Sequence, residues 1–485
     1  SAVIADAVRS FPDNTEFSAL LTFKGSGEGR YVQQIAADPE ALTVKQRVSF
    51  VRLPPPGFTP RAYHPGSGGY SIGYFDFARP IHENLDVRWQ PRFRLQKTDP
   101  NAARSTVVKP IVFYLDRGTP EPIRSALLEG ANWWSEAFDA AGFIGGFRAE
   151  LAPPGMNMSD VRYNTITWTH RATRGWSYGG GLIDPRTGEI LKGYVNLGSQ
   201  RVRQDLLIAE SLLAPYGKNA DPALQAEAQA MALARLRQLA AHEVGHALGF
   251  AHNFAASRTA TGSVLDYPHP QISMDAQGRP RLQGAYAVGV GDWDRFIVAH
   301  AYGQFPAAQE QSALAQLRAA VAAKGYRYAS DPDSRQPEDA HDASVLWDIP
   351  GEPLRGLEHL MAIRKAALAR FADGALPPDR EVGEAERRLV PLYLLHRYQS
   401  EAVICLIGGS DTRYGVVSDG LPAVRAVSGA QQQQALQAAA GVLGTEVLTL
   451  PDSILAVLQP PSNEYSRTRE DFETRMAPLF DPMQA

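Results

Sequence analysis

Histidine and glutamate gather in one short stretch of this chain, HEVGHALGFAH at residues 242–252. His242 and His246 lie four positions apart. On an α-helix they therefore face the same side, about 40° apart around the axis. Two imidazoles in that arrangement can bind one tetrahedral metal ion. The segment therefore predicts a metal site.

A long helix is expected to carry the first two histidines. The stretch that begins at Pro222 is rich in Ala, Leu, Gln and Arg, has proline at the first helical position and holds no helix breaker before Gly245. Gly249 then permits the left-handed conformation that ends a helix. The chain can turn back there and present His252 as a third ligand.

Glu243 is predicted to act beside the metal rather than on it. On a helix it lies about 100° around the axis from His242, which places its carboxylate next to the ion. Three neutral nitrogens leave the fourth position of a tetrahedral zinc open for water, which distinguishes a catalytic zinc site from a closed structural one. We therefore expect Zn²⁺ on His242, His246 and His252, with Glu243 as the general base for a zinc-bound water.

The pattern HExxHxxGxxH resembles that of the metzincin metallopeptidases, which are zinc endopeptidases. The strings HEVGHALGFAHNF, DPRTGEIL and GVGDWDRFIVAHAYG are similar to a bacterial branch described as zinc-dependent metalloproteases. The resemblance implies a tight turn beneath the metal. Residues 263–267, SVLDY, are similar to the family's Ser-x-Met-x-Tyr and place Leu265 at the methionine position.

Two further roles are implied by this resemblance. Leu265 would form an apolar support under the histidines, and leucine is close to methionine in volume. Tyr267 matches a tyrosine that in some branches binds the metal or supports the transition state, although it could also only anchor the turn. The hairpin near residues 183–195, preceded by Gly179–Gly181, would provide an edge strand along which a protein or peptide substrate lies extended. The alternative is an ordinary surface hairpin.

These features together predict a zinc-dependent endopeptidase that hydrolyses internal peptide bonds, with Glu243 and Tyr267 as catalytic residues. Two alternatives stay open, a non-catalytic binding protein stabilised by zinc and a zinc hydrolase that acts on a non-peptide amide. The sequence GYSIG at residues 69–73 matches the nucleophile elbow of serine hydrolases around Ser71. That chemistry needs a helix after the serine, and the following YFDFARP is not typical of one.

The pattern of apolar and polar residues along the chain predicts an α+β fold with three regions. Residues 1–105 alternate apolar and polar residues between Pro and Gly clusters, as expected of a β-rich N-terminal region. Residues 106–305 alternate strand-like and helix-like segments and would form a metzincin-like zinc catalytic domain. Residues 306–485 are predicted to be mainly helical. The expected helices there are 307–323, 353–371, 384–403 and 430–443.

Composition excludes several classes of protein. The 485 residues are 44% hydrophobic and 21% charged, as in ordinary folded proteins. The formal net charge of −4 gives no basic excess, so we expect no nucleic-acid partner. No apolar run approaches the roughly 18 residues of a membrane span. No feature of the sequence indicates an oligomeric state.

The remaining signals are weaker. Cys405, the single cysteine, has apolar neighbours and is predicted to be an inert buried thiol. The acidic stretch at 331–348 fails the EF-hand pattern and is expected to be a solvated loop. The first residues, SAVIADAVRSF, lack the features of a signal peptide. We expect a bacterial exported protein, periplasmic or extracellular, with no signal peptide in this chain. Two explanations stay open, that there was no signal peptide or that the chain is a processed or trimmed form.

Overall fold

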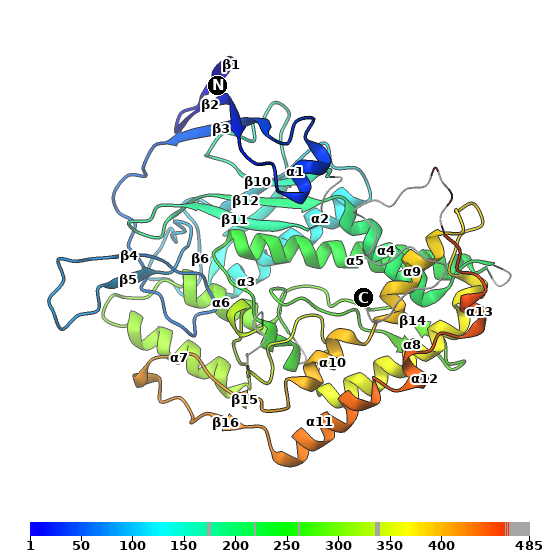
Figure 1. The fold of residues 1–485 in the computed structure, drawn as a ribbon. Coiled ribbons are helices and arrows are strands. Elements are labelled where there is room, and N and C mark those ends of the chain that lie inside the picture. The colour runs from blue at the N-terminus through cyan, green and yellow to red at the C-terminus, as the bar shows by residue number, and fades with distance from the viewer. Residues whose placement is uncertain are drawn as a thin grey trace.

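The structure is a computed structural model that describes residues 1–171, 176–217, 220–259, 262–334 and 340–460, with Ser462 and Glu464. It confirms the predicted α+β class. A β-rich N-terminal region leads into a central sheet with helices, and a helical region follows (Figure 1). The proposed division of the chain near residues 105 and 305 stays a prediction.

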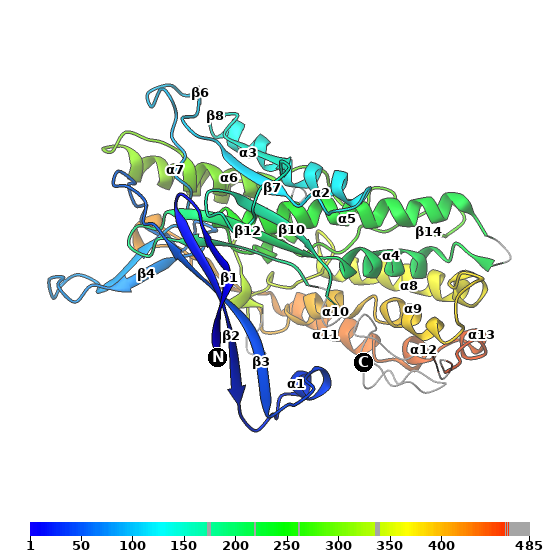
Figure 2. The same cartoon turned by 90° about the horizontal axis from the view of Figure 1, so that it is seen from above.

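The N-terminal region begins with an antiparallel sheet that projects from the body of the molecule (Figure 2). Its strands pair in the order β1-β2-β3. Their bounds are β1 Ala2–Ser10, β2 Asn14–Lys24 and β3 Ala41–Val51, with the short helix α1 Arg30–Ile35 between the last two. A second hairpin follows, formed by β4 Ile72–Phe75 and β5 Asp86–Trp89. Because β4 follows Ser71 directly, no nucleophile elbow forms there.

The central sheet has the strand order β11-β12-β10-β7-β9. The bounds are β7 Ile111–Leu115, β9 Phe147–Leu151, β10 Asn164–Thr169, β11 Tyr178–Ile183 and β12 Ile190–Gly198. Neighbouring strands are parallel except for β11, which pairs antiparallel with β12 through a turn at residues 184–188. The predicted hairpin is therefore present, and β11 is the end strand of the sheet in the described part of the chain. A short parallel pair, β6 Ser105–Thr106 and β8 Phe143–Ile144, lies beside it.

Helices cover one face of this sheet and enclose the main hydrophobic core. They are α2 Ile123–Asn132, α3 Trp134–Ala140 and α5 Pro222–Ala247, and α4 Gln200–Leu213 packs alongside α5. The core between sheet and helices includes Phe113, Leu127, Phe138 and Val244, all fully buried. The helix α6 Asp292–Tyr302 packs against α3 and adds Ile297 to the same cluster.

The 26-residue helix α5 is the element that the sequence predicts best. It starts at Pro222, and the Asp221 carboxylate accepts a hydrogen bond from the backbone N–H of Ala223 over 2.9 Å, which caps the first turn. The helix is about 39 Å long. Its N-terminal half lies in a second hydrophobic cluster with α4 and the C-terminal helices, and its C-terminal half lies under the central sheet.

The C-terminal region is helical, as predicted, with one correction. Its helices are α7 Glu310–Ala323, α8 Pro353–Gly374, α9 Glu384–Tyr393, α10 Arg397–Ile404, α11 Gly429–Gly441, α12 Thr445–Leu448 and α13 Asp452–Leu455. Small strand pairs occur between them and before them, β13 Ser273–Met274 with β14 Pro280–Arg281 and β15 Ser410–Asp411 with β16 Arg425–Ala426.

The correction concerns the single helix expected over 384–403, which is wrong because the chain breaks between α9 and α10. Pro391 lacks a backbone N–H and crowds the preceding turn near the end of α9. The buried guanidinium of Arg364 donates over 2.7 Å to the carbonyl of Tyr393 at the break, and the backbone N–H of Arg397 bonds the carbonyl of Leu394 instead. Cys405 follows α10 and is half-buried rather than fully buried.

Among the described residues, no single helix is both long and apolar enough to cross a bilayer. The stretches Gly429–Gly441 and Thr445–Leu455 reach that length and hydropathy only when counted together, and they bend by 51° at the break between them.

The contact between α2 and α5 generates a prediction. A Cβ on Gly130 would lie 2.0 Å from the carbonyl oxygen of Arg237 on α5, so the two helices can approach only because residue 130 is glycine. We expect Gly130→Ala to destabilise the protein by about 1–3 kcal/mol through overpacking, which a calorimetric melting temperature measures. In Gly441→Ala, where nothing lies within 4 Å, alanine should be neutral or slightly stabilising. Equal melting temperatures for the two variants would contradict this view of the contact.

Candidate metal centre

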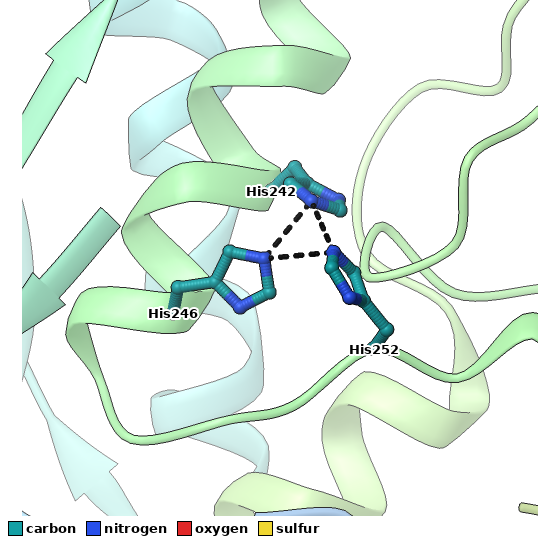
Figure 3. Close-up of side chains that lie close together, drawn as sticks. All are labelled: His242, His246 and His252. Atoms are coloured by element: carbon teal, nitrogen blue, oxygen red, sulfur yellow. Dashed lines mark hydrogen bonds between the residues drawn. The ribbon is translucent and has the colours of Figure 1, made fainter. Parts of the chain in front are cut away.

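The three predicted histidines meet at one point. His242 and His246 project from the last turns of α5, and His252 returns to them from the chain that follows (Figure 3). Their Nε2 atoms lie 3.0 Å apart for His242 and His246, and 3.2 Å apart for each of the other two pairs. A tetrahedral zinc with bonds of about 2.0–2.1 Å needs nitrogens at nearly this separation.

The opposite nitrogen of each ring is held by an acceptor. Nδ1 of His242 lies 2.8 Å from the carbonyl oxygen of Val264, and Nδ1 of His246 lies 2.8 Å from that of Phe250. Nδ1 of His252 lies 2.6 Å from the carboxylate of Asp331. Because these acceptors require a proton on Nδ1, each Nε2 carries an unprotonated lone pair directed at the other two.

Lone pairs in such an arrangement repel one another unless a cation lies between them, so the donor set fits Zn²⁺. Protonation of His242 or His246 does not relieve the repulsion near neutral pH. Burial lowers the pKa of His242 well below its ordinary value, and burial together with the neighbouring His252 lowers the pKa of His246 to about 3. Neutral imidazoles are the form that binds metal.

Gly249 is required for the turn that delivers His252. Its φ is +101°, a conformation that side chains disfavour. A Cβ at this position would also lie 2.4 Å from the carbonyl oxygen of Pro91. The predicted role of this glycine is therefore confirmed, and the close approach of the N-terminal segment adds a second reason for it.

The turn at residues 263–267 lies against the zinc-binding part of α5, as the resemblance implies. Leu265 is fully buried, and a Cβ on Gly245 would lie 2.7 Å from its Cδ2 atom. Gly245 stands one position before the ligand His246, so Leu265 packs directly against the turn of α5 that carries both histidines. This is the position of an apolar support.

Two carboxylates that the sequence did not single out hold this arrangement in place. Asp294 of α6 is fully buried and accepts hydrogen bonds from the backbone N–H of Val264 at 3.0 Å and the hydroxyl of Ser263 at 2.5 Å, which fixes the turn. Asp331 belongs to the acidic stretch that was expected to be a solvated loop. The side chain of Asp331 is 43% exposed, in line with that expectation, and it is also the partner of His252. Neither residue has a spacing to the zinc motif that could have predicted its role.

Glu243 lies beside the ligands in a buried position. Burial raises its pKa to about 8, although the guanidinium of Arg235 and the backbone N–H of Gly179, which is hydrogen-bonded to the carboxylate, act to lower it. A Cβ on Gly179 would lie 1.9 Å from the backbone oxygen of Glu243. Glycine therefore lets strand β11 approach α5 closely at the residue predicted to be the base.

Tyr267 packs against two of the three ligands. Its ring centroid lies 5.2 Å from that of His242 and 4.7 Å from that of His252. Trp347 stacks on its other side, 5.1 Å away with ring planes 23° apart, and the backbone N–H of Trp347 donates to the Tyr267 carbonyl over 3.0 Å. No sequence pattern indicated a role for Trp347, which comes from a distant loop.

The packing of Leu265 generates a testable expectation. Leu265→Met keeps an apolar side chain of similar volume and should change zinc affinity by less than tenfold, since such exchanges cost under about 1.5 kcal/mol. Leu265→Asp would bury an unpaired charge against Gly245 and should weaken both zinc binding and stability. Competition with a chromogenic chelator measures the affinity. Normal zinc binding by Leu265→Asp would show that the turn does not support the ligands.

Comparison with known families agrees with this geometry. The family described as Met-zincin matches residues 225–481, more than half of the 485 residues, and that range contains all three histidines, the 263–267 turn and α5 except for its first three residues. A domain of unknown function (DUF5117) matches residues 1–98. No curated protein and no solved structure shows a significant match. The chain therefore belongs to the Met-zincin family of zinc metallopeptidases, with His242, His246 and His252 as its zinc site.

Proposed function

We propose that this protein is a zinc-dependent endopeptidase that hydrolyses internal peptide bonds, with Glu243 as general base and Tyr267 as a second catalytic residue. The position of Glu243 carries the proposal. It directly follows the ligand His242 on α5, its side chain is buried, and burial raises its pKa to about 8. A purely structural zinc site has no use for a buried acid in that place, because burying a carboxylate is costly.

Each residue has a definite task in this reaction. Bound Zn²⁺ supplies Lewis-acid chemistry, which acidifies a water molecule and polarises the scissile carbonyl. Glu243 accepts the proton that the attacking water loses and later gives it to the nitrogen of the leaving amine. The close approach of Gly179 on β11 to the backbone of Glu243 holds this residue in place.

Strand β11 supports a peptide as the substrate. It has β12 as its one neighbour in the described sheet, and it passes close to Glu243 at Gly179. A peptide that adds to its other side as a further strand gains main-chain hydrogen bonds whatever its side chains are. Such a peptide would run past the zinc site in an extended form, as endopeptidase cleavage requires.

Tyr267 is proposed to act through its phenol group. Its ring packs against His242, His252 and Trp347, and these contacts support a role of the phenol beside the zinc ligands. From there the hydroxyl can donate a hydrogen bond to the carbonyl oxygen that becomes negative when water attacks. Donors of this kind act mainly in the transition state.

The test of the proposal is Glu243→Gln, which keeps the shape of the side chain and removes its basicity. We expect a full complement of zinc and a loss of peptidase activity of about 10²–10⁴-fold, the usual contribution of a general base. Zinc content is measured by mass spectrometry and activity by sequencing the cleavage products of a denatured protein mixture. Glu358→Gln, on the exposed side of α8, is the matched control and should behave as wild type.

The two other functions give different results in the same experiment. A non-catalytic zinc-binding protein would leave the denatured proteins uncut in wild type and variant alike. A hydrolase of non-peptide amides would also leave them uncut, yet cleave small amide substrates in a reaction that a chelator stops. Either result would contradict the endopeptidase proposal, as would cleavage that persists in chelator.

A second prediction separates the two possible roles of Tyr267. Tyr267→Phe keeps the ring contacts with the histidines and Trp347 and removes only the hydroxyl. We expect kcat to fall by about 10²–10³, with little change in KM and unchanged zinc content. If the tyrosine only anchors the turn, kcat per bound zinc should stay near that of wild type while the melting temperature falls.

A further inference from the structure

The segment 61–95 of the N-terminal region packs against the zinc site, although it belongs to the part of the chain matched by a domain of unknown function. The backbone N–H of Tyr70 donates to the carbonyl of Gly249 over 3.0 Å, and the N–H of Ala251 donates to the carbonyl of Gly68 over 3.0 Å. These bonds pair the N-terminal segment with the turn that connects the second and third ligands. Gly69 and Phe250 form an antiparallel β-bridge at the same place.

The pairing brings one side chain to a zinc ligand. The hydroxyl oxygen of Tyr70 lies 2.8 Å from Nδ1 of His246. That nitrogen carries a proton, because Nε2 of the same ring faces the other two ligands. Nδ1 of His246 therefore donates to two acceptors, the Tyr70 oxygen and the Phe250 carbonyl, each at 2.8 Å.

Two glycines directly before Tyr70 allow the chain to pack closely against its neighbours and so restrict the position of Tyr70. A Cβ on Gly69 would lie 1.9 Å from Nε2 of Gln90, whose side chain is buried. Gly68 has a φ of +71°, and a Cβ there would lie 2.7 Å from Cγ2 of Ile297. The segment is thus seated tightly between Gln90 and α6 directly before Tyr70.

The start of the segment is fixed by a buried cation. Arg61 is 4% exposed and donates to three carbonyl oxygens at the end of α6, those of His300, Ala301 and Gly303, over 2.7–2.8 Å. Further along, Arg94 forms hydrogen bonds with both carboxylate oxygens of Glu189, next to the hairpin that contains β11. The segment is therefore held at both ends by the elements that surround the zinc site.

The Tyr70 ring itself contributes little to the core. It is 40% exposed, so its placement next to His246 depends on the backbone pairing and on the hydroxyl contact. Residues that hydrogen-bond the second nitrogen of a ligating histidine fix the orientation of the ring and the proton on that nitrogen. Their removal typically costs about 10–100-fold in metal affinity or activity.

We propose that Tyr70 is a positioning residue of the zinc site. The N-terminal segment 61–95 completes this site, because the Tyr70 hydroxyl accepts a hydrogen bond from Nδ1 of the ligand His246. The region of unknown function is then not a separate module. It supplies a second acceptor for His246 beside the carbonyl of Phe250, whereas Val264 and Asp331 are the acceptors of the other two ligands. The inference concerns zinc binding and does not depend on the substrate.

The experiment compares Tyr70→Phe with wild type and with Tyr74→Phe, a matched control on the exposed side of β4 in the same segment. The zinc dissociation constant is measured by competition with a chelator, and the melting temperature is measured on the metal-free proteins. For Tyr70→Phe we expect zinc binding to weaken by about tenfold or more with an unchanged metal-free melting temperature. Tyr74→Phe should match wild type in both.

Nuclear magnetic resonance of the zinc-loaded protein adds a readout that a merely structural role would not change. Tyr70→Phe should shift the Nδ1 proton signal of His246 and leave those of His242 and His252 in place. Wild-type zinc affinity with an unmoved His246 signal would overturn the proposal. The proposal would also be overturned if Tyr70→Phe lost zinc affinity and its metal-free form were destabilised to the same extent, because the residue would then act only on folding. Because no substrate is used, these results stand whether or not the protein proves to be an endopeptidase.

Discussion

Three unprotonated imidazole nitrogens held within 3.2 Å of one another are the constraint on which this structure depends. Without a cation their lone pairs repel, and burial opposes relief by protonation. The protein must therefore orient each ring through a hydrogen bond to Nδ1, the nitrogen opposite the metal-binding Nε2. It does so with acceptors from separate parts of the chain: a carbonyl of the 263–267 turn, the carbonyl of Phe250 with Tyr70, and the carboxylate of Asp331.

The surrounding elements follow from the need to bring these acceptors together. Asp294 of α6 fixes the turn that offers Val264, and Asn253 ties that turn to the third ligand through the hydrogen bond from its N–H to the carbonyl of Leu265 at 3.1 Å. Leu265 fills the space against Gly245. The zinc site is thus the meeting point of α5, α6, the loop at Asp331 and the N-terminal segment, rather than a property of one helix.

Several close contacts around α5 depend on glycine. Gly130 admits α2, Gly179 admits β11 and Gly245 admits Leu265 and Trp134. Each contact packs an element against the part of the molecule that carries the ligands, so little space remains in which the histidines could shift. Dense packing of this kind suits a site whose geometry must stay fixed while a substrate binds and leaves.

The sequence by itself determined the ligands, the helix that carries two of them and the turn glycine, because these depend on spacing within a few residues. His242 and His246 share a face of any α-helix, and Gly249 suits any left-handed turn. Tertiary structure alone decided which groups hold those ligands. Asp331, Asp294 and Tyr70 are 79, 31 and 176 positions from the residues they bond. No local pattern encodes such distances, because they arise only when strands and helices far apart in the chain pack together. The unbroken helix expected over 384–403 is wrong for a partly local reason, because Pro391 disfavours it, while the distant guanidinium of Arg364 bonds the carbonyl of Tyr393 at the break.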